Sequence, residues 1–534
     1  MFKGKFKGVN VERKIPRTMS TQHPDNASMP SWCLSDIIQG DDEIREAYFV
    51  YKELGCQEVM WDSEGKDVDT RVVRKLLSNY GEYFRRKILG KDVFLTYRIP
   101  NPHIDVVERK IVLETLWNIP VASDVASAFY GKEAEPIFEV ILPFTTNSEE
   151  LIRLFNFYKR GIANSETIEL DGSSTKLRDW VGSLRPQKIE VIPLVEDIDS
   201  LLRVDEIIDG YLRVIKPGYI RVFLARSDPA LNYGLFCSVL LCKLALSKLY
   251  MLSKRSNAAI YPIIGAGSVP FRGHLSPDNV QNFINEYLGA YTVTIQSAFK
   301  YDYSIKIVRE AVKFLNENLP VDEAVLIEPH EEKILLSIIG KFRSRYQAVI
   351  EKLAPLINSV ASHVPRRRAR KLHIGLFGYS RSVRGIALPR AIPFVASLYS
   401  IGIPPELIGA GAIQDLNEEE WDTLRRYYVN LEEDLKGAAC YLSWQNINML
   451  KDMSRRVTNR SRMSEESLKF ALERLLADFN SIEKNLGVKL GPVSLRHRKH
   501  ENITSNFFIS YLERKDHEAR AYLIDAAKVR NFLG

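Results

Sequence analysis

Short apolar runs alternate with longer amphipathic segments over the first two-thirds of the chain. Apolar runs of four to eight residues are typical of strands buried on both faces, and apolar residues repeated every three or four positions are typical of helices. The runs that predict strands span 56–61, 92–97, 137–142, 189–195, 220–225, 258–264, 292–297 and 372–377. Helical segments separate nearly all of them, among them 70–88, 106–117, 149–161, 201–215, 230–252 and 277–288. Eight alternating units predict an α/β fold, namely a (β/α)8 barrel of the TIM type. A doubly wound open sheet is the alternative.

Additional helices are expected beyond this minimal barrel, mainly in the C-terminal part. Between the last two predicted strands the pattern indicates helices at 304–315 and 331–353. Beyond residue 409 no convincing strand remains, and the segments that read as mainly helical are 416–435, 464–486 and 501–529. We therefore expect a catalytic barrel with helical insertions over residues 1–408 and a helical layer over 409–534 that packs on it.

The stretch from Lys188 to Gly234 reads as strand, helix, strand, with an acidic residue just after each strand. Glu196 follows the first strand and Asp228 follows the second. The helical connection implies parallel strands, so both carboxylates should leave the sheet at the same edge. Neighbouring strands lie about 4.8 Å apart, which would let the pair bind one hard cation such as Mg²⁺ or Mn²⁺. The alternative is that both residues are structural, with Asp228 before Pro229 as a helix N-cap.

Arginines accompany acidic residues at the other predicted strand ends. Arg98, Arg226, Arg272 and Arg381 lie at strand ends or in the loops that follow them. In a barrel those loops gather at one face, where barrel enzymes carry their active sites. Arginine binds phosphate and carboxylate through two parallel hydrogen bonds, so this mixture suits a divalent cation and a substrate carrying both groups. Any one arginine taken alone is more often a solvated surface charge.

The loop Gly265–His274 combines small residues with a single arginine, Arg272. Glycine lets a backbone approach an anion closely, and such a loop could close over a site to keep water out. The loop matches neither the P-loop nor the dinucleotide fingerprint, so it does not indicate a nucleotide.

Charge is spread along the chain rather than concentrated. Its 74 basic and 67 acidic residues leave a net charge of +7. Proteins that bind nucleic acid usually gather basic residues on one surface with interleaved aromatics, so we expect no nucleic-acid partner. The one basic run, 366–371, is interpreted as a solvated linker.

The cysteines and the apolar segments bear on the compartment. The five cysteines include no Cys-x-x-Cys pair, which is typical of free thiols in a reducing compartment, and cytoplasm is the default. The basic first seventeen residues lack the apolar core of a signal peptide. Lys243 and Lys248 interrupt the apolar stretch 235–252, so a buried helix is predicted there rather than a membrane span.

Several segments form an ordered set along the chain. They are Thr-Met-Ser-Thr-Gln-His-Pro-Asp-Asn at 18–26, Pro-Leu-Val-Glu at 193–196, Leu-Ala-Arg-Ser-Asp-Pro-Ala-Leu-Asn-Tyr-Gly at 224–234, Gly-Ser-Val at 267–269 with Arg272, Gly-Tyr-Ser-Arg at 378–381, Leu-Pro-Arg-Ala-Ile-Pro at 388–393, and the glycine-ended segment 526–534. Together they resemble phosphoenolpyruvate carboxylase, in particular the short archaeal type. The specificity lies in the ordered set, since no single segment would suffice.

The resemblance implies that the chain carboxylates phosphoenolpyruvate with bicarbonate, giving oxaloacetate and phosphate through carboxyphosphate and the enolate of pyruvate. It implies Glu196 and Asp228 as the ligands of Mg²⁺ or Mn²⁺ and a homotetrameric assembly. The catalytic residues it implies are His23, Arg272 and Arg381, with His23 as the base. The substrate-binding residues are Arg98, Arg272, Arg381, Arg390, Gly267 and Ser268. Without the resemblance, His23 would be interpreted as a loop histidine bonded to backbone.

The chain departs from the longer bacterial and plant enzymes of this family. Ile263 and Gly265 stand where those enzymes carry a histidine and an arginine, and Leu231 stands where they carry a lysine. Some contacts must therefore come from elsewhere, and the candidates are Lys66, Arg98 and His274. One alternative function is another metal-dependent barrel lyase or phosphotransferase acting on phosphoenolpyruvate or a 2-oxo acid. From a different class, the chain could be a regulatory or RNA-binding protein without catalysis.

Overall fold

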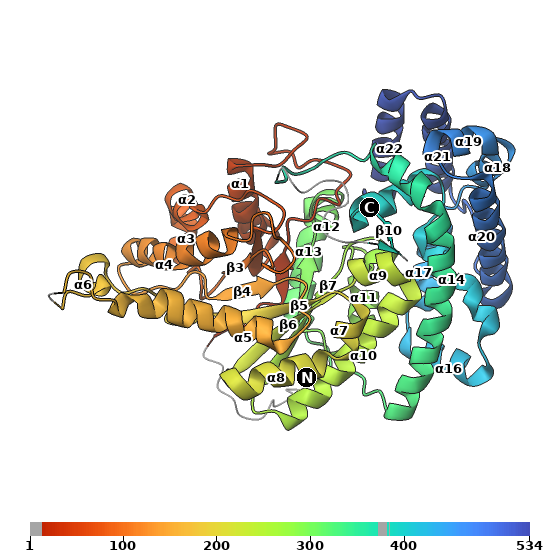
Figure 1. The fold of residues 1–534 in the computed structure, drawn as a ribbon. Coiled ribbons are helices and arrows are strands. Elements are labelled where there is room, and N and C mark those ends of the chain that lie inside the picture. Colours follow the sequence, from red (N-terminus) through yellow and green to blue (C-terminus); the bar gives the residue numbers. More distant parts are fainter. Residues whose placement is uncertain (1–12, 173, 372–381, 384) are drawn as a thin grey trace.

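A closed barrel of eight parallel strands forms the centre of the molecule (Figure 1). The computed structural model describes residues 13–172, 174–371, 382–383 and 385–534. The barrel strands are β1 (Thr18–Ser20), β2 (Glu58–Asp62), β3 (Phe94–Arg98), β4 (Glu139–Leu142), β5 (Glu190–Val195), β6 (Tyr219–Ala225), β7 (Ala259–Gly265) and β8 (Thr292–Ile295). β1 pairs with β8, with Met19 beside Thr294, and this pairing closes the barrel. The predicted (β/α)8 barrel is confirmed, and the open sheet was the wrong alternative.

The first barrel strand lies in the polar segment 18–27, where the apolar runs predict no strand. β1 is three residues long, and its one apolar residue, Met19, packs inside the barrel. Its neighbours in that interior cluster are Met60, Ile141, Ile192, Leu194, Phe223 and Ile263. One apolar residue cannot produce a visible period of two, which is why the pattern missed this strand. The strand predicted at 372–377 lies outside the described residues, and the barrel closes without it.

Charged side chains fill the amino-terminal end of the barrel interior. Arg221 on β6 donates to Glu58 at the start of β2 and to Glu139 at the start of β4, with its Nη atoms 2.7–2.8 Å from the carboxylate oxygens. All three side chains are buried. Alternate strands of a TIM barrel contribute to the same interior layer, and here that layer is ionic. This ionic layer closes the amino-terminal end of the barrel, so a pocket inside the barrel can open only at the carboxyl ends of the strands.

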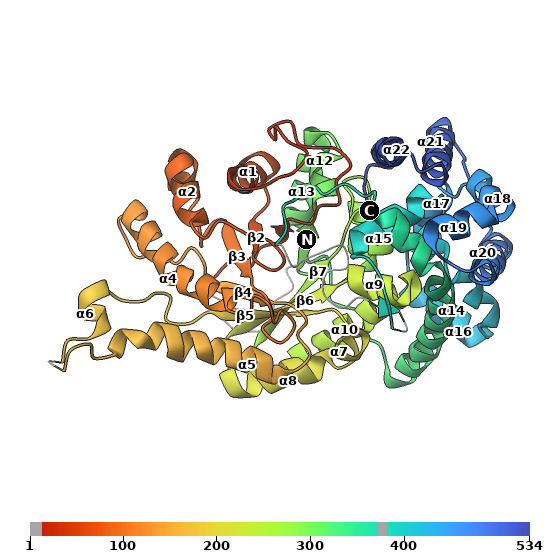
Figure 2. The same cartoon turned by 45° about the horizontal axis from the view of Figure 1, so that its top comes forward.

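Most of the helices that come before or between the barrel strands pack around the outside of the barrel. They are α1 (Asp41–Phe49), α2 (Val72–Asn79), α3 (Gly81–Arg86), α4 (Ile111–Tyr130), α5 (Ser148–Asn156), α6 (Leu177–Val181), α7 (Ile198–Leu202), α8 (Val204–Ile215), α9 (Ser227–Tyr233), α10 (Leu235–Arg255) and α11 (Val280–Glu286). Two more follow β8, α12 (Ser297–Tyr301) and α13 (Ile305–Asn318). Helix α6 is the exception, since it sits on an arm that projects away from the barrel (Figures 1 and 2).

The remaining helices form a layer on one side of the barrel (Figure 2). They are α14 (Pro329–Ala361), α15 (Ala391–Ser400), α16 (Glu418–Tyr427), α17 (Leu431–Ala439), α18 (Trp444–Asp452), α19 (Ser454–Ser461), α20 (Glu465–Leu486), α21 (Leu495–Leu512) and α22 (Asp516–Arg530). A short hairpin, β9 (Ser382–Val383) with β10 (Ile386–Ala387), precedes α15. The long helix α14 starts with a capping box between Glu328 and Glu331 and packs against α20. The domain boundary at 408/409 stays a prediction, although the layer already includes α14.

Helix α10 is the apolar stretch that called for a membrane check. It packs between α14, α8 and β7, and most of its residues are buried. Lys243 pairs with Glu286 at 2.7 Å and Lys248 with Glu332 at 2.9 Å. Among the described residues, α10 is the single helix long and apolar enough to cross a membrane, or one of two if the bent segment 391–415 counts as a span. Its burial fits the predicted core helix.

Candidate active site

A pocket opens at the carboxyl ends of the barrel strands, where the loops after the strands meet the start of α15. The predicted site residues that line it are His23, Arg98, Glu196, Asp228, Arg272 and Arg390. The other polar residues of its wall are Glu64, Ser227, Gln296 and Arg370. Gly267 and Ser268 are not among the described lining residues, and Arg381 lies outside the part of the chain that the structure describes. One pocket therefore collects residues from separate segments of the chain.

Glu196 follows β5 directly and is held by the end of the neighbouring strand. Its Oε2 accepts a hydrogen bond from the backbone N–H of Phe144 at 2.9 Å. Phe144, just after β4, has a φ of 52°, in the left-handed region that residues other than glycine seldom adopt. This backbone conformation aims an N–H at the carboxylate, and such strain is typical of functional sites.

Asp228 enters the pocket from the strand next to Glu196. β5 and β6 are parallel and Val195 pairs with Leu224, so the two carboxylates leave the barrel at the same edge, as predicted. The alternative that Asp228 is a helix N-cap is wrong, because α9 starts at Ser227 and its cap position is Arg226. Asp197, beside Glu196, does cap a helix, since it accepts from the Ser200 N–H at 2.9 Å. Neither pocket carboxylate is therefore explained by capping.

Arg98 is fixed by acidic residues at the end of β2 and just after it. Its Nε and Nη2 donate to the two carboxylate oxygens of Asp62 at 2.8 and 2.6 Å, and Nη2 lies 3.1 Å from Glu64. Asp62 and Arg98 stand opposite each other in the β2–β3 register. A bidentate pair of this kind restricts the guanidinium to one orientation. Arg98 thus adds a rigid cation to the pocket wall.

Arg272 is buried and makes four contacts in the site. Nε donates to Ser227 at 3.0 Å, Nη2 to Gln296 at 2.6 Å, and Nη1 both to Asp25 at 3.1 Å and to the Gly534 oxygen at 2.6 Å. Burial lowers the pKa of Arg272 and raises that of Asp25, although each opposes the other's shift by its own charge. Asp25 is a residue of the site that sequence reasoning did not single out; its signal was its place inside the otherwise unexplained polar segment 18–27.

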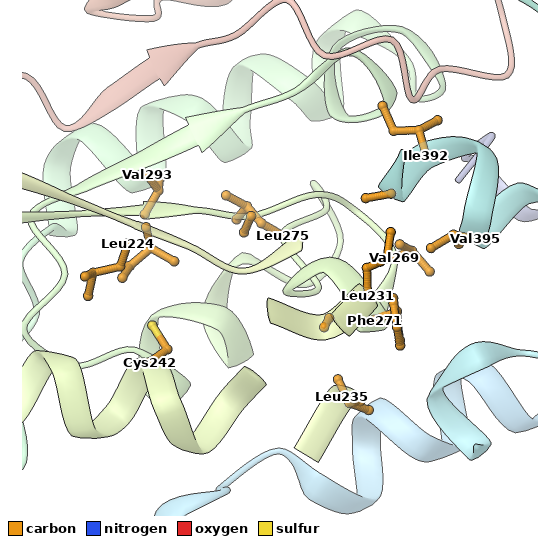
Figure 3. Close-up of a cluster of buried hydrophobic side chains, with 14 of the residues drawn as sticks. Leu224, Leu231, Leu235, Cys242, Val269, Phe271, Leu275, Val293, Ile392 and Val395 are labelled. Atoms are coloured by element: carbon orange, nitrogen blue, oxygen red, sulfur yellow. The ribbon is translucent and has the colours of Figure 1, made fainter. Parts of the chain in front are cut away.

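The glycine loop lies against the helical layer rather than in solvent. Val269 and Phe271 of the loop pack with Leu231 of α9 and with Ile392 and Val395 of α15 (Figure 3). A Cβ atom at Gly267 would stand 3.0 Å from the Arg272 guanidinium carbon, so glycine is what lets the arginine lie against the loop. Gly265 and Arg272 of the loop line the pocket, and closure of the loop over the site stays a prediction.

His23 lines the pocket within a loop after β1. Its Nδ1 lies 2.8 Å from the Thr21 hydroxyl oxygen. Burial, together with the charges of Arg98, Arg272, Arg390 and Arg370, lowers the pKa of His23 well below its usual value of 6.5. The imidazole is therefore neutral at pH 7, which is the state that a general base requires.

The basic run 366–371 is not a solvated linker, so that prediction was wrong. Arg368 is buried and donates to Glu46 at 2.6 Å, and Arg367 donates to the carbonyl of Ala27. Arg370 lines the pocket. A buried carboxylate far away in the sequence takes up the charge of Arg368, and no local pattern reveals such a partner. The run therefore contributes Arg370 to the pocket wall.

A second groove lies between the starts of α14 and α16. Its lining includes the acidic residues Glu331, Glu418, Glu419 and Asp422. Negative charge of this density repels an anionic substrate. A phosphate-bearing substrate is therefore expected at the barrel pocket and not in this groove.

Comparisons with known proteins agree along the whole chain. A family model described as phosphoenolpyruvate carboxylase matches residues 15–534. Proteins named phosphoenolpyruvate carboxylase from Caldivirga maquilingensis and Metallosphaera sedula are each 49% identical over 522 residues, which is 98% of this chain and 100% of the relative. A protein of the same name from Picrophilus torridus is 42% identical over 521 residues, 97% of this chain and 99% of the relative.

Proposed function

Because the chain belongs to the phosphoenolpyruvate carboxylase family, we propose that it joins phosphoenolpyruvate and bicarbonate to give oxaloacetate and phosphate. The observation that carries the proposal is the pocket at the barrel's carboxyl end, which brings together two carboxylates, a neutral histidine and several arginines. Carboxylates can hold a divalent cation, arginines an anionic substrate, and the histidine can move a proton.

Substrate binding is assigned to the cations of the pocket wall. Phosphoenolpyruvate carries a phosphate and a carboxylate, and Arg370 and Arg390 stand in the wall together with Arg98. Four contacts engage the Arg272 guanidinium in this conformation, so its charge acts on the pocket while its position is fixed. Arg381 stays a predicted phosphoryl-binding residue. Fixed cations of this kind stabilise the charge that develops on a transferring phosphoryl group.

The reaction is proposed to run in three steps. A bicarbonate oxygen attacks the phosphorus, and the bond between phosphorus and the enol oxygen breaks, which leaves carboxyphosphate and the enolate of pyruvate. His23 then accepts the proton of carboxyphosphate, which splits into CO₂ and phosphate. The enolate carbon attacks CO₂ and forms the new carbon–carbon bond. Leu194, Phe223 and Ile392 give the pocket apolar walls that keep water from the enolate.

Glu196 and Asp228 are proposed to hold a divalent cation. Both are oxygen donors at the same edge of the barrel, and both line the pocket. This donor set fits Mg²⁺ or Mn²⁺, which prefer carboxylate oxygens and leave positions for substrate. When bound, the ion would supply positive charge to the substrate's oxygens as a Lewis acid.

The test is an assay for oxaloacetate. The protein is supplied with phosphoenolpyruvate, bicarbonate and Mg²⁺, and oxaloacetate is followed through malate dehydrogenase and NADH. Turnover should require all three, and Glu196→Gln or Asp228→Asn should lower kcat by about 100-fold or more. Asp197→Asn is the matched control, because it removes a neighbouring carboxylate that caps α7 and does not line the pocket. Release of phosphate from phosphoenolpyruvate without bicarbonate, and without oxaloacetate, would point to another lyase or phosphotransferase instead.

Compartment and assembly remain part of the proposal. Free cysteines support the cytoplasm, since none of the five forms a disulfide. A homotetramer is expected from the family, and no nucleic-acid or membrane partner is expected.

A further inference from the structure

Helix α4 is apolar on every side. Among its 20 residues only Glu114 and Asp124 carry a charge. A helix of this kind is usually covered on all faces. One face packs against α2 and the turn Phe157–Ile162. The opposite face leaves Trp117 41% and Val121 52% exposed, so it lacks a cover among the described residues.

The exposed face is a continuous seam along the helix. Steps of three and four residues connect the exposed positions 110, 114, 117, 121, 124 and 128, and this is the spacing of a helix–helix contact. Leu113 lies beside Trp117 on the same face and is also exposed. Lys110 stands before the first turn and Asp124 near the other end, and neither forms an ion pair with another described residue. The seam therefore carries Lys110 at one end and Asp124 toward the other, with Glu114, Trp117 and Val121 between them.

We propose that this face is the contact between two copies of the chain, with their α4 helices antiparallel about a two-fold axis at Trp117. In an antiparallel pair, positions equally distant from the axis meet, so Lys110 faces Asp124 of the partner subunit. Leu113 likewise faces Val121 of the partner subunit. A two-fold interface requires such self-complementarity, because each residue pair occurs twice. The position of the charges thus favours a second copy over an unrelated partner.

The arm that carries α6 adds a second apolar surface. This arm, residues 163–172 and 174–187, projects away from the barrel beyond α4 (Figures 1 and 2). No residue of α6 is buried, and Trp180 is 75% exposed. Arg185 at its base lies 3.0 Å from Glu133, just past the end of α4. An antiparallel pair places this end near the start of the partner's α4, where Val107, 73% exposed, precedes the helix.

The exposed apolar area is sufficient for a stable contact. The exposed apolar side chains of the α4 segment are Ile104, Val106, Val107, Leu113, Trp117 and Val121, and those of the arm are Ile168, Leu170, Trp180 and Val181. Each is at least 40% exposed, and an interface of standard size buries about 800 Å² per partner. Apolar patches on monomers rarely exceed about 600 Å². Two such pairs would also suffice as building blocks of a tetramer with two-fold axes.

The first test measures mass in solution. Sedimentation velocity at micromolar concentration should give an assembly for the natural sequence, and Trp117→Glu should halve its mass or weaken self-association at least tenfold. Leu495→Glu is the control, because Leu495 is 90% exposed on α21 in the helical layer, and it should leave the mass unchanged. Circular dichroism confirms that the variants are folded. A monomer for the natural sequence, or an unchanged mass for Trp117→Glu, overturns the proposal.

The second test reads the register of the pair. Lys110→Asp and Asp124→Lys should each weaken self-association about tenfold, and the double variant should recover it, because the exchanged charges meet again across the axis. In a Cys33→Ser background, which leaves four buried cysteines, Trp117→Cys should form a disulfide-linked dimer under mild oxidation. Leu495→Cys in the same background should stay uncrosslinked. Failure of the double variant to recover, with no crosslink at 117, overturns the antiparallel arrangement.

Discussion

The substitution Gly534→Ala should break one of the hydrogen bonds that hold Arg272 in place. The Cβ atom of Gly534→Ala would stand 2.2 Å from the carbonyl oxygen of Ile392 and 2.8 Å from the backbone nitrogen of Ala396. Both are backbone atoms of α15, and moving them would require a shift of the packed helix. Residue 534 must therefore shift, and with it the oxygen that accepts from Arg272 Nη1 at 2.6 Å.

The magnitude follows from what Arg272 loses. A hydrogen bond to a charged group contributes about 1.5–3 kcal/mol, and the guanidinium keeps its contacts to Ser227, Asp25 and Gln296. If the whole of this hydrogen-bond free energy is lost from the transition state, kcat/KM falls by about 10- to 150-fold. Leu533 also donates its N–H to the Asp25 carbonyl at 2.7 Å, so a larger shift would disturb Asp25 as well and move the effect toward the upper value.

The measurement is kcat and KM for phosphoenolpyruvate in the coupled assay for oxaloacetate. Lys528→Ala serves as the control, since Lys528 is exposed on α22 and lies on the same C-terminal segment. Its kinetics should match those of the natural sequence. If Gly534→Ala keeps kcat/KM within twofold, the Gly534 contact does not position Arg272 and the reasoning is refuted.

Three further predictions follow from the buried charges. Arg221→Met should lower the free energy of unfolding by about 3–5 kcal/mol, because two buried carboxylates lose their cation; denaturant unfolding measures this, and Gln at both carboxylates should restore most of it. The acid limb of the kcat/KM profile should lie below pH 6.5, because burial and the neighbouring arginines lower the pKa of His23. Arg370→Gln removes one of these charges and should move the limb to higher pH; an unmoved limb contradicts the assignment. Mg²⁺ at 100 times its dissociation constant should add about 2.7 kcal/mol of stability in thermal melts, and Glu196→Gln or Asp228→Asn should abolish the gain.

The sequence predicted what is encoded locally or in ordered segments. The apolar runs of β5 and β6, with a helical stretch between them, were enough to place Glu196 and Asp228 at one edge of the sheet. Strands buried on both faces have a strong local signal, and parallel pairing follows from the crossover. Arg98 was placed in the site by its position at a strand end, and His23 and Arg390 through the resemblance; all three line the pocket.

What was missed depends on contacts between distant parts of the chain. Arg368 was interpreted as solvated, yet its partner Glu46 lies 322 residues away. Asp25 and Arg272 are 247 residues apart, and only the fold shows that they touch. The capping alternative for Asp228 was wrong because α9 begins two residues earlier than Pro229 suggested. Burial of a charge is decided by its tertiary partner, and no local pattern carries that information.

In the proposed mechanism, the arginines of the pocket couple substrate binding to the base, His23. In the structure their charges, added to burial, keep the pKa of His23 low, so the histidine is neutral but a weak proton acceptor. Phosphoenolpyruvate and bicarbonate bring negative charge to the same cations. That charge offsets the arginines and raises the pKa of His23 at the stage when a proton has to be accepted. The same arginines can thus bind the substrate and keep His23 neutral, while the basicity of His23 increases only in the complex. Substituting a single arginine should therefore change both KM and the pH profile.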